Sequence, residues 1–245
     1  MLYSVQPREA ARPGTPRHNT RRMEMPMTDP KPDAPARRSF FGRLAGVAAL
    51  GLAGLAPTPL RAATIAEKRE GPDWPGKLKG RHRQVVDAYE VNSGRPLAFA
   101  HAFLATTTPP GTATSVVIVR SEALPIALNS GIWQKYKIGE ALKIIDPETK
   151  GPATKNPFLD PKPGVLMVDD MAVARLLRQG TIFGACDLAL RGLSRKLASN
   201  ANISADDATK EWAANLVPGI VLLPSGVWGL NRAQEAGCTY CTGGG

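Results

Sequence analysis

The stretch Thr114–Arg120, with the sequence TSVVIVR, decides the fold class. It is an unbroken run of mostly β-branched residues between Gly111 and Glu122. A strand that is apolar on both faces belongs in a sheet that is covered on both sides, and such sheets are mostly parallel. The run therefore predicts a central strand with helices above and below it.

The chain on either side of this strand alternates between strand-like and helix-like segments. Short links between such segments are typical of parallel sheets with helical crossovers. A long excursion with five prolines interrupts the alternation at 147–164, and loops of that length are usually functional or disordered. We therefore expect a three-layer α/β/α sandwich with a mostly parallel sheet of about five strands. Further strands are expected at 83–89, 181–186, 219–224 and 238–242, with a short strand or extended piece at 143–146. Helices are expected at 95–106, 129–142, 169–180, 187–199, 204–216 and 227–237.

The net charge of +10 is concentrated in the leader. Residues 1–63 hold 10 basic and 4 acidic residues, which leaves a net charge of only +4 for the rest of the chain. No basic run interleaved with aromatic residues follows residue 63. Nucleic-acid binding is therefore not expected.

The leader predicts export. Residues 1–36 are rich in Pro, Arg, Thr and Met without apolar periodicity, which predicts a disordered N-terminal extension. The sequence RRSFF at 37–41 precedes a mild apolar run at 44–56, a pattern typical of twin-arginine signal peptides. The alternative is a chance arginine pair before a buried helix. We expect a signal peptide at 37–63, cleaved near Ala62 or Ala63, and the twin-arginine translocation machinery as a partner.

Two consequences follow for the boundaries of the protein. Met23, Met25 and Met27 lie closer to the arginine pair than Met1 does, so the natural start is expected at one of them. After cleavage, residues 64–80 are expected to be a linker in which Trp74 docks on the domain, and residues 81–245 form the domain. The product is expected to be soluble and periplasmic, or otherwise exported.

Cys186 is the first candidate site residue. It ends the expected strand 181–186, and Asp187 opens the next helix. Ligands of such folds gather at the carboxyl ends of strands, and the positive end of a helix dipole stabilises a thiolate there. The charge of Asp187 opposes that effect. The alternative is a small buried side chain that packs under the sheet, the commonest fate of a free cysteine.

Ser225 also follows a strand, so Ser225 and Asp187 are candidate ligand-binding residues. The alternative for Ser225 is the N-cap of the following helix, which we favour. No glycine-rich loop has a dinucleotide or P-loop spacing, and no cofactor is predicted. No metal site is predicted either, because Cys238 and Cys241 would need two further ligands from distant positions.

The sequence GCTYCTG at 237–243 contains a C-x-x-C pair. Redox pairs of this type sit at a helix start, whereas Thr239 and Tyr240 favour a strand. Residues three apart in a strand point to opposite faces, so Cys238 and Cys241 are poorly placed to bridge each other. A C-x-x-C oxidoreductase is therefore only the third hypothesis.

The segment GTIFGACDLALRGL at 180–193 resembles the DsrE/DsrF-like sulfur-relay proteins. The segments 79–90, 129–144 and 219–244 are similar to exported proteins with such a domain and unassigned activity. The resemblance covers roughly residues 80–244. It implies the α/β/α fold, a persulfide on Cys186, and a symmetric homo-oligomer. The long loop at 147–164 departs from a minimal relay domain.

These observations lead to two functional hypotheses. The first is an exported DsrE-like domain that binds or transfers sulfur or redox equivalents through Cys186, with a small sulfur-containing ligand or a partner protein. The second is a non-catalytic module that binds a small ligand or a protein in the same pocket.

Overall fold

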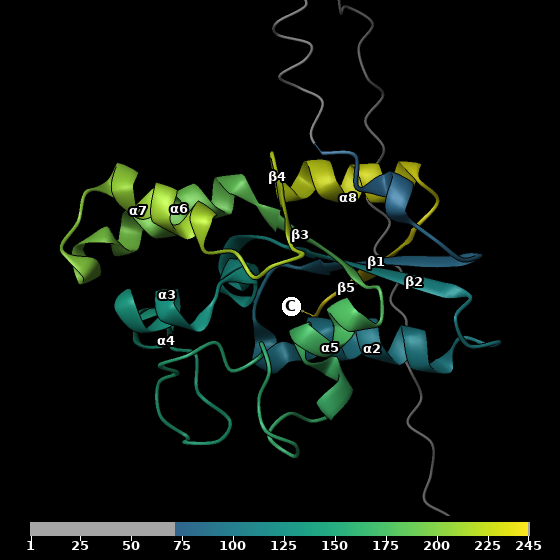
Figure 1. The fold of residues 1–245 in the computed structure, drawn as a ribbon, viewed down its shortest axis with the longest axis horizontal. Coiled ribbons are helices and arrows are strands. Elements are labelled where there is room, and N and C mark those ends of the chain that lie inside the picture. Colours follow the sequence, from purple (N-terminus) through teal and green to yellow (C-terminus); the bar gives the residue numbers. More distant parts are fainter. Residues whose placement is uncertain (1–71, 245) are drawn as a thin grey trace, which may run out of the picture. The chain divides into compact units, whose positions relative to one another are not determined.

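The computed structural model describes residues 72–244, and a five-stranded sheet forms their centre (Figure 1). All neighbouring strands pair in parallel, in the order β4-β3-β2-β1-β5. The apolar run Thr114–Arg120 lies in the middle strand, as predicted. The strands are β1 (His82–Ala88), β2 (Ala113–Val119), β3 (Ile182–Cys186), β4 (Val221–Leu223) and β5 (Thr239–Thr242).

The strand order explains why helices cover both faces. Strands β1 to β4 are added side by side in one direction, and β5 then returns to the other edge, beside β1. Because crossovers between parallel strands are right-handed, the reversal places the last helix on the opposite face from the earlier ones. The α helices are α2 (Arg95–Thr106), α3 (Ser130–Lys135), α4 (Ile138–Ala141), α5 (Val173–Arg178), α6 (Asp187–Leu197), α7 (Ala205–Ala214) and α8 (Gly226–Glu235).

Figure 1 shows these layers: α8 lies above the sheet, and α2 and α5 lie below it. Helices α3, α4, α6 and α7 lie beyond the carboxyl ends of the strands, at the left of the view. The predicted three-layer α/β/α sandwich is therefore confirmed, and its sheet is parallel throughout.

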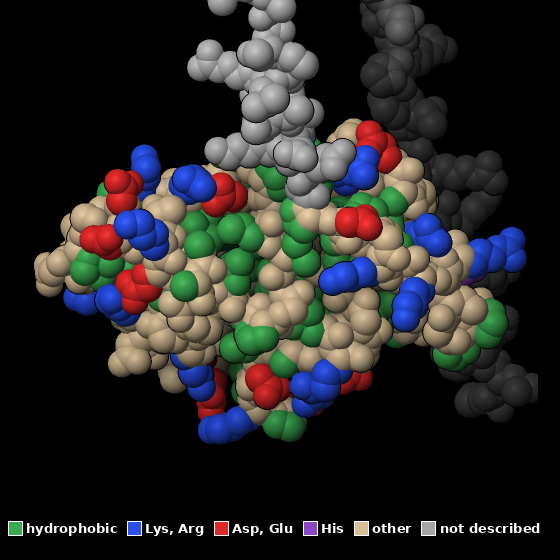
Figure 2. All heavy atoms as spheres, turned by 45° about the horizontal axis from the view of Figure 1, so that its top comes forward, with side chains coloured by type: hydrophobic (Ala, Val, Ile, Leu, Met, Phe, Trp, Pro, Cys, Tyr) green, Lys and Arg blue, Asp and Glu red, His purple; other side chains and the backbone are tan. Residues whose placement is uncertain are grey.

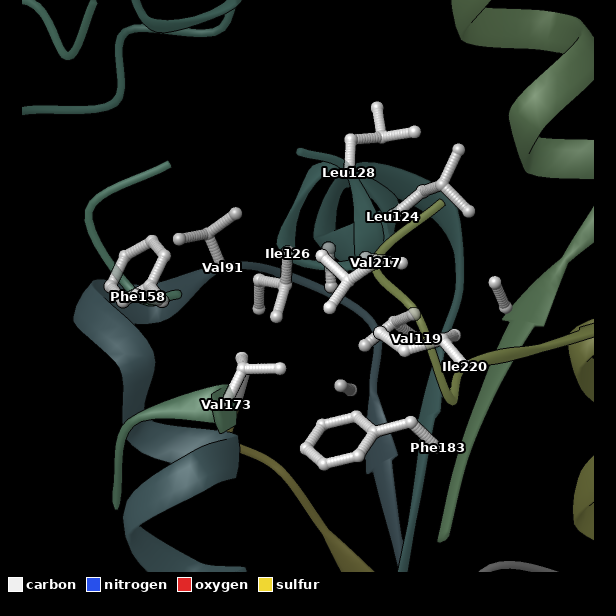
Figure 3. Close-up of a cluster of buried hydrophobic side chains, with 14 of the residues drawn as sticks. Val91, Val119, Leu124, Ile126, Leu128, Phe158, Val173, Phe183, Val217 and Ile220 are labelled. Carbon is white, nitrogen blue, oxygen red and sulfur yellow. The ribbon is translucent and has the colours of Figure 1, made fainter. Parts of the chain in front are cut away.

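Two apolar clusters hold the layers together. The α8-face cluster contains Val85, Val116, Ile118 and Leu223 from the sheet and Leu230 from α8. Because buried apolar area stabilises a fold by about 25 cal/mol per Å², the clusters on both faces of the sheet contribute to the stability of the domain. The larger α2-face cluster is shown in part in Figure 3, where side chains from several elements converge: Val119, Ile126, Val173, Phe183 and Val217.

Part of the expected linker is packed against the domain. Trp74 and Leu78 are buried members of the α8-face cluster, so Trp74 docks as predicted. The 3-10 helix Pro75–Lys77 lies between them. Residues 72–80 therefore belong to the folded unit.

Two of the expected helices are shorter than predicted. The segment 129–142 is divided at Lys137, whose φ of 49° is left-handed, so α3 and α4 are separate. The segment 169–180 begins as a 3-10 turn and becomes α5 only after Ala172, whose backbone is extended (ψ 139°). The piece at 143–146 is no strand; it contributes one antiparallel bridge, between Ile145 and Pro152.

The long loop at 147–164 is anchored to the domain. The Asn156 side chain is buried, and its amide nitrogen donates hydrogen bonds to the carbonyls of Ile126 (3.0 Å) and Leu128 (2.8 Å). Phe158 is a buried member of the α2-face cluster. The loop therefore supplies part of the core.

The expected N-terminal extension, the twin-arginine signal peptide and its cleavage site lie outside the described residues. Within residues 72–244, no helix has both the length and the hydropathy that crossing a bilayer requires.

Candidate functional site

The helices that follow β3 and β4 pack against different apolar clusters. The helix after β3, α6, packs into the α2-face cluster through Leu190 and Leu197, whereas α8, after β4, covers the other face. Open α/β sheets bind ligands at such a switch point, at the carboxyl ends of the strands. The residues at this point are Cys186, which ends β3, and Ser225, which follows β4.

Cys186 is the N-cap of α6, and its residue surface is 6% exposed. The backbone N–H of Ala189 points at its Sγ, with a distance of 3.4 Å between N and Sγ. Cys186 belongs to neither the α2-face cluster nor the α8-face cluster. Strand alternation places its side chain on the same side as Ile182, toward α8. The Sγ of Cys186 therefore lies at the N-terminal end of α6.

Arg120 lies beside Cys186 in the sheet. Val119 pairs with Ala185, so Arg120 and Cys186 hold the next positions on two adjacent strands. The side chain of Arg120 packs against the start of α8, because a Cβ added at Gly226 would lie only 2.7 Å from the Arg120 Cβ. The guanidinium therefore belongs to the α8 face, as Cys186 does.

Asp87 fixes the position of this guanidinium. The Arg120 Nε donates to Asp87 Oδ1 (2.7 Å) and one terminal nitrogen donates to Oδ2 (2.9 Å). Tyr240 donates its hydroxyl to Oδ2 (3.0 Å), and the Tyr89 ring centroid lies 4.6 Å from the guanidinium carbon. The hydrogen bonds to Asp87 raise the pKa of Arg120 above its ordinary value, despite the opposing effect of burial. A permanent, oriented cation is the result.

Tyr240 stays a donor in this network. Burial first, and then its hydrogen bond to Asp87, raise the pKa of the Tyr240 hydroxyl. A phenol with a raised pKa remains protonated at neutral pH, so the hydroxyl donates to the carboxylate. We call the group formed by Asp87, Tyr89, Arg120 and Tyr240 the Arg120 network.

The other predicted site residues, Ser225 and Asp187, lie at the N-terminal ends of helices. Ser225 is the N-cap of α8, and its Oγ accepts a hydrogen bond from the Trp228 N–H (3.1 Å). The favoured interpretation of Ser225 is thus confirmed. Asp187 is the first residue of α6 and forms an ion pair with Arg191 (2.7 Å). Both residues adjoin the switch point, and their side chains are already engaged.

The C-x-x-C pair lies in and beside β5, as expected. Cys238 is buried in the α8-face cluster, whereas Cys241 packs against the α2-face cluster, and both thiols are free. Burial raises the pKa of both thiols, although the charge of Arg83 acts in the opposite direction on Cys238. The prediction that they point to opposite faces is confirmed. Within residues 72–244, no group of three or more His, Cys, Asp and Glu side chains is arranged to hold a metal ion.

The Arg120 network was not predicted from the sequence. One signal for it was present: Asp87 is a carboxylate inside the strand HRQVVDA, and it is only 6% exposed. A buried carboxylate requires a partner. The identity of that partner depends on the pairing of β1 with β2, which the sequence does not show.

Comparisons with known proteins leave the family open. No protein-family model and no curated protein matches the sequence. One similar solved structure is that of a protein of unknown function, MTH1491, from Methanobacterium thermoautotrophicum. It is 17% identical and covers 66% of this chain and 99% of its own chain, with a TM-score of 0.37.

Proposed function

We propose that the chain is an exported domain of the DsrE-like type, in which Cys186 accepts and passes on sulfane sulfur. The observation that carries this proposal is the position of Cys186. It lies at the switch point of the sheet, its Sγ accepts an N–H from the first turn of α6, and Arg120 holds the equivalent backbone position on the adjacent strand. Ligands of open α/β sheets gather at such strand ends, beside the starts of helices.

The reaction is an exchange between two sulfur atoms. The thiolate of Cys186 attacks the outer sulfur of a small persulfide donor, so that a new S–S bond forms on Cys186. The S–S bond of the donor breaks, and the donor leaves as a thiolate with the electron pair of that bond. No net oxidation occurs. The N-terminal end of α6, where Cys186 is the N-cap, would stabilise the negative charge of the Cys186 persulfide.

Thiol labelling of the folded full-length chain tests this function. We expect iodoacetamide to label Cys186 at neutral pH, and Cys186→Ser to remove that label, whereas Cys241→Ser leaves it in place. In a separate, unalkylated sample, glutathione persulfide should add the mass of one sulfur atom at Cys186, removable with dithiothreitol. A Cys186 that neither reacts at neutral pH nor gains sulfur contradicts the proposal.

A second candidate function is binding without chemistry at the same place. Two tyrosines of the Arg120 network and two apolar residues in the first turns of α6 and α8 are exposed, by between 48% and 67%. Figure 2 brings the top of Figure 1, where α8 lies, toward the reader and shows hydrophobic side chains gathered in the middle of that view. Exposed apolar patches mark interaction sites, and Tyr and Arg are enriched in them. The four residues are Tyr89, Leu188, Val227 and Tyr240.

For this candidate, the proposed occupant of the patch is a second copy of the chain, in a symmetric homo-oligomer. Light scattering of the wild type and of Val227→Asp, an exposed position in α8, separates the two functions. If the wild type is an oligomer that Val227→Asp dissociates, and Cys186 is unreactive, the result favours the second candidate function, binding without chemistry. A monomeric wild type excludes this form of the second candidate.

A further inference from the structure

A cavity of about 250 Å³ lies at the carboxyl ends of β1 and β2, away from Cys186. Its lining includes Val91, Ile144 and Phe158, which are buried members of the α2-face cluster, together with polar and charged residues. The cavity therefore belongs to the α2 side of the sheet, whereas Cys186 and Arg120 belong to the α8 side. It is a separate site from the one proposed above.

Three charged side chains line the same cavity. Glu90 and Glu122 follow β1 and β2, and Lys143 follows α4. None of the three takes part in the ion pairs found among residues 72–244. Two exposed carboxylates and one exposed ammonium at this cavity are thus available to bind charged groups of a ligand.

The backbone around the cavity holds an uncommon conformation. Asn92, Ser93 and Lys143, which line it, have φ values of 43°, 53° and 55°, and Ser121, next to Glu122, has a φ of 46°. Residues other than glycine rarely adopt positive φ, and such residues cluster at binding sites that are formed in advance. The Asn92 side chain also donates to the carbonyl of Gly244 (2.9 Å), which ties the loop to the end of β5.

We propose that this cavity binds a free amino acid with an apolar side chain. The apolar residues of the lining, which include the exposed Ile145, contact the side chain. Glu90 and Glu122 bind the ammonium group, and Lys143 binds the carboxylate. The volume of about 250 Å³ suits a single amino acid of medium size. The net charge of −1 on the three groups makes the ammonium the principal anchor. This site does not depend on the chemistry of Cys186.

Isothermal titration calorimetry of the full-length chain tests the site. The probes are L-leucine, L-methionine and L-phenylalanine, with two analogues of leucine that each lack one charged group: 3-methylbutylamine and 4-methylpentanoate. We expect at least one amino acid to bind, and its charge-deleted analogues to bind about tenfold more weakly, since each loses a charge-assisted hydrogen bond. For methionine and phenylalanine the corresponding analogues are the amine and the acid of the same side chain.

Variants then locate the binding. Glu122→Gln should weaken binding of the amino acid and the amine about tenfold, whereas Lys143→Met should weaken binding of the amino acid and the acid. Lys150→Met is the matched control, because Lys150 also has a left-handed φ (61°) but does not line the cavity. Thermal unfolding verifies that each variant is folded. Failure of all three amino acids to bind, equal binding of the analogues, or insensitivity to both cavity variants overturns the proposal.

Discussion

The ion pair between Asp87 and Arg120 should be the strongest in the described part of the chain, and a double-mutant cycle measures it. The cycle compares the wild type with Asp87→Asn, Arg120→Met and the double variant. Two hydrogen bonds of 2.7 and 2.9 Å join the pair, and Asp87 is 6% exposed. Hydrogen bonds to charged groups contribute about 1.5–3 kcal/mol each when buried. Because the Arg120 side chain is 24% exposed, we expect a coupling free energy of only about 2 kcal/mol for the pair.

Urea unfolding of the full-length chain, followed by tryptophan fluorescence, gives the four free energies of unfolding. Trp74, Trp133 and Trp212 are all buried and report on the core. Each single variant should lose more stability than the coupling alone, because a buried charge or amide is left without its partner.

The ion pair between Asp187 and Arg191 provides the control cycle. It also has a distance of 2.7 Å, but it spans one turn of α6 and its arginine is 55% exposed. Pairs of this kind contribute about 0.3–0.5 kcal/mol. A coupling for Asp87 and Arg120 no larger than that of the control would refute the reasoning that burial makes this pair strong.

Three further predictions concern single positions. Gly192→Ala should raise the free energy of unfolding by up to about 1 kcal/mol, because Gly192 lies inside α6 and an added Cβ meets no atom within 4 Å. Thermal unfolding measures the change, and a loss of stability would contradict the prediction. Ser225→Ala should lower the free energy of unfolding by about 1 kcal/mol through loss of the N-cap hydrogen bond, and Ser225→Asp should retain most of it. In a Cys186→Ser background, alkylation of Cys238 and Cys241 should stay slow at neutral pH and increase only at alkaline pH. Burial raises the pKa of both thiols, and the reactive thiolate forms only above that pKa. Mass spectrometry across pH measures the labelling, and complete labelling at neutral pH would contradict the prediction.

The sheet was predictable because its strands carry their signal locally. The run Thr114–Arg120 is apolar on both faces, and such a strand is stable only between two covering layers. The strands predicted at 83–89, 181–186, 219–224 and 238–242 all exist, with ends that differ by at most two residues. The helix N-cap at Ser204 was predictable for the same local reason, and its Oγ accepts the Asp207 N–H.

The features that were missed depend on contacts between distant residues. The break at Lys137 is one example, since Gly139 of α4 packs directly on the backbone of Ala153, where a Cβ would lie 2.2 Å from the carbonyl oxygen. The Arg120 network is another, because Asp87 and Arg120 are 33 residues apart and meet only when β1 pairs with β2. A sequence pattern contains no information about either of these contacts between distant residues.

One turn of the chain separates the two proposed sites. Arg120 follows β2 on the α8 side, and Glu122, two residues later, lines the cavity on the α2 side. Between them, Ser121 has a φ of 46°, a left-handed conformation that reverses the local direction of the backbone. An extended residue at this position would continue the strand instead of turning the chain between the two charges. The strained turn at Ser121 is therefore what allows the end of a single strand to serve both faces of the sheet.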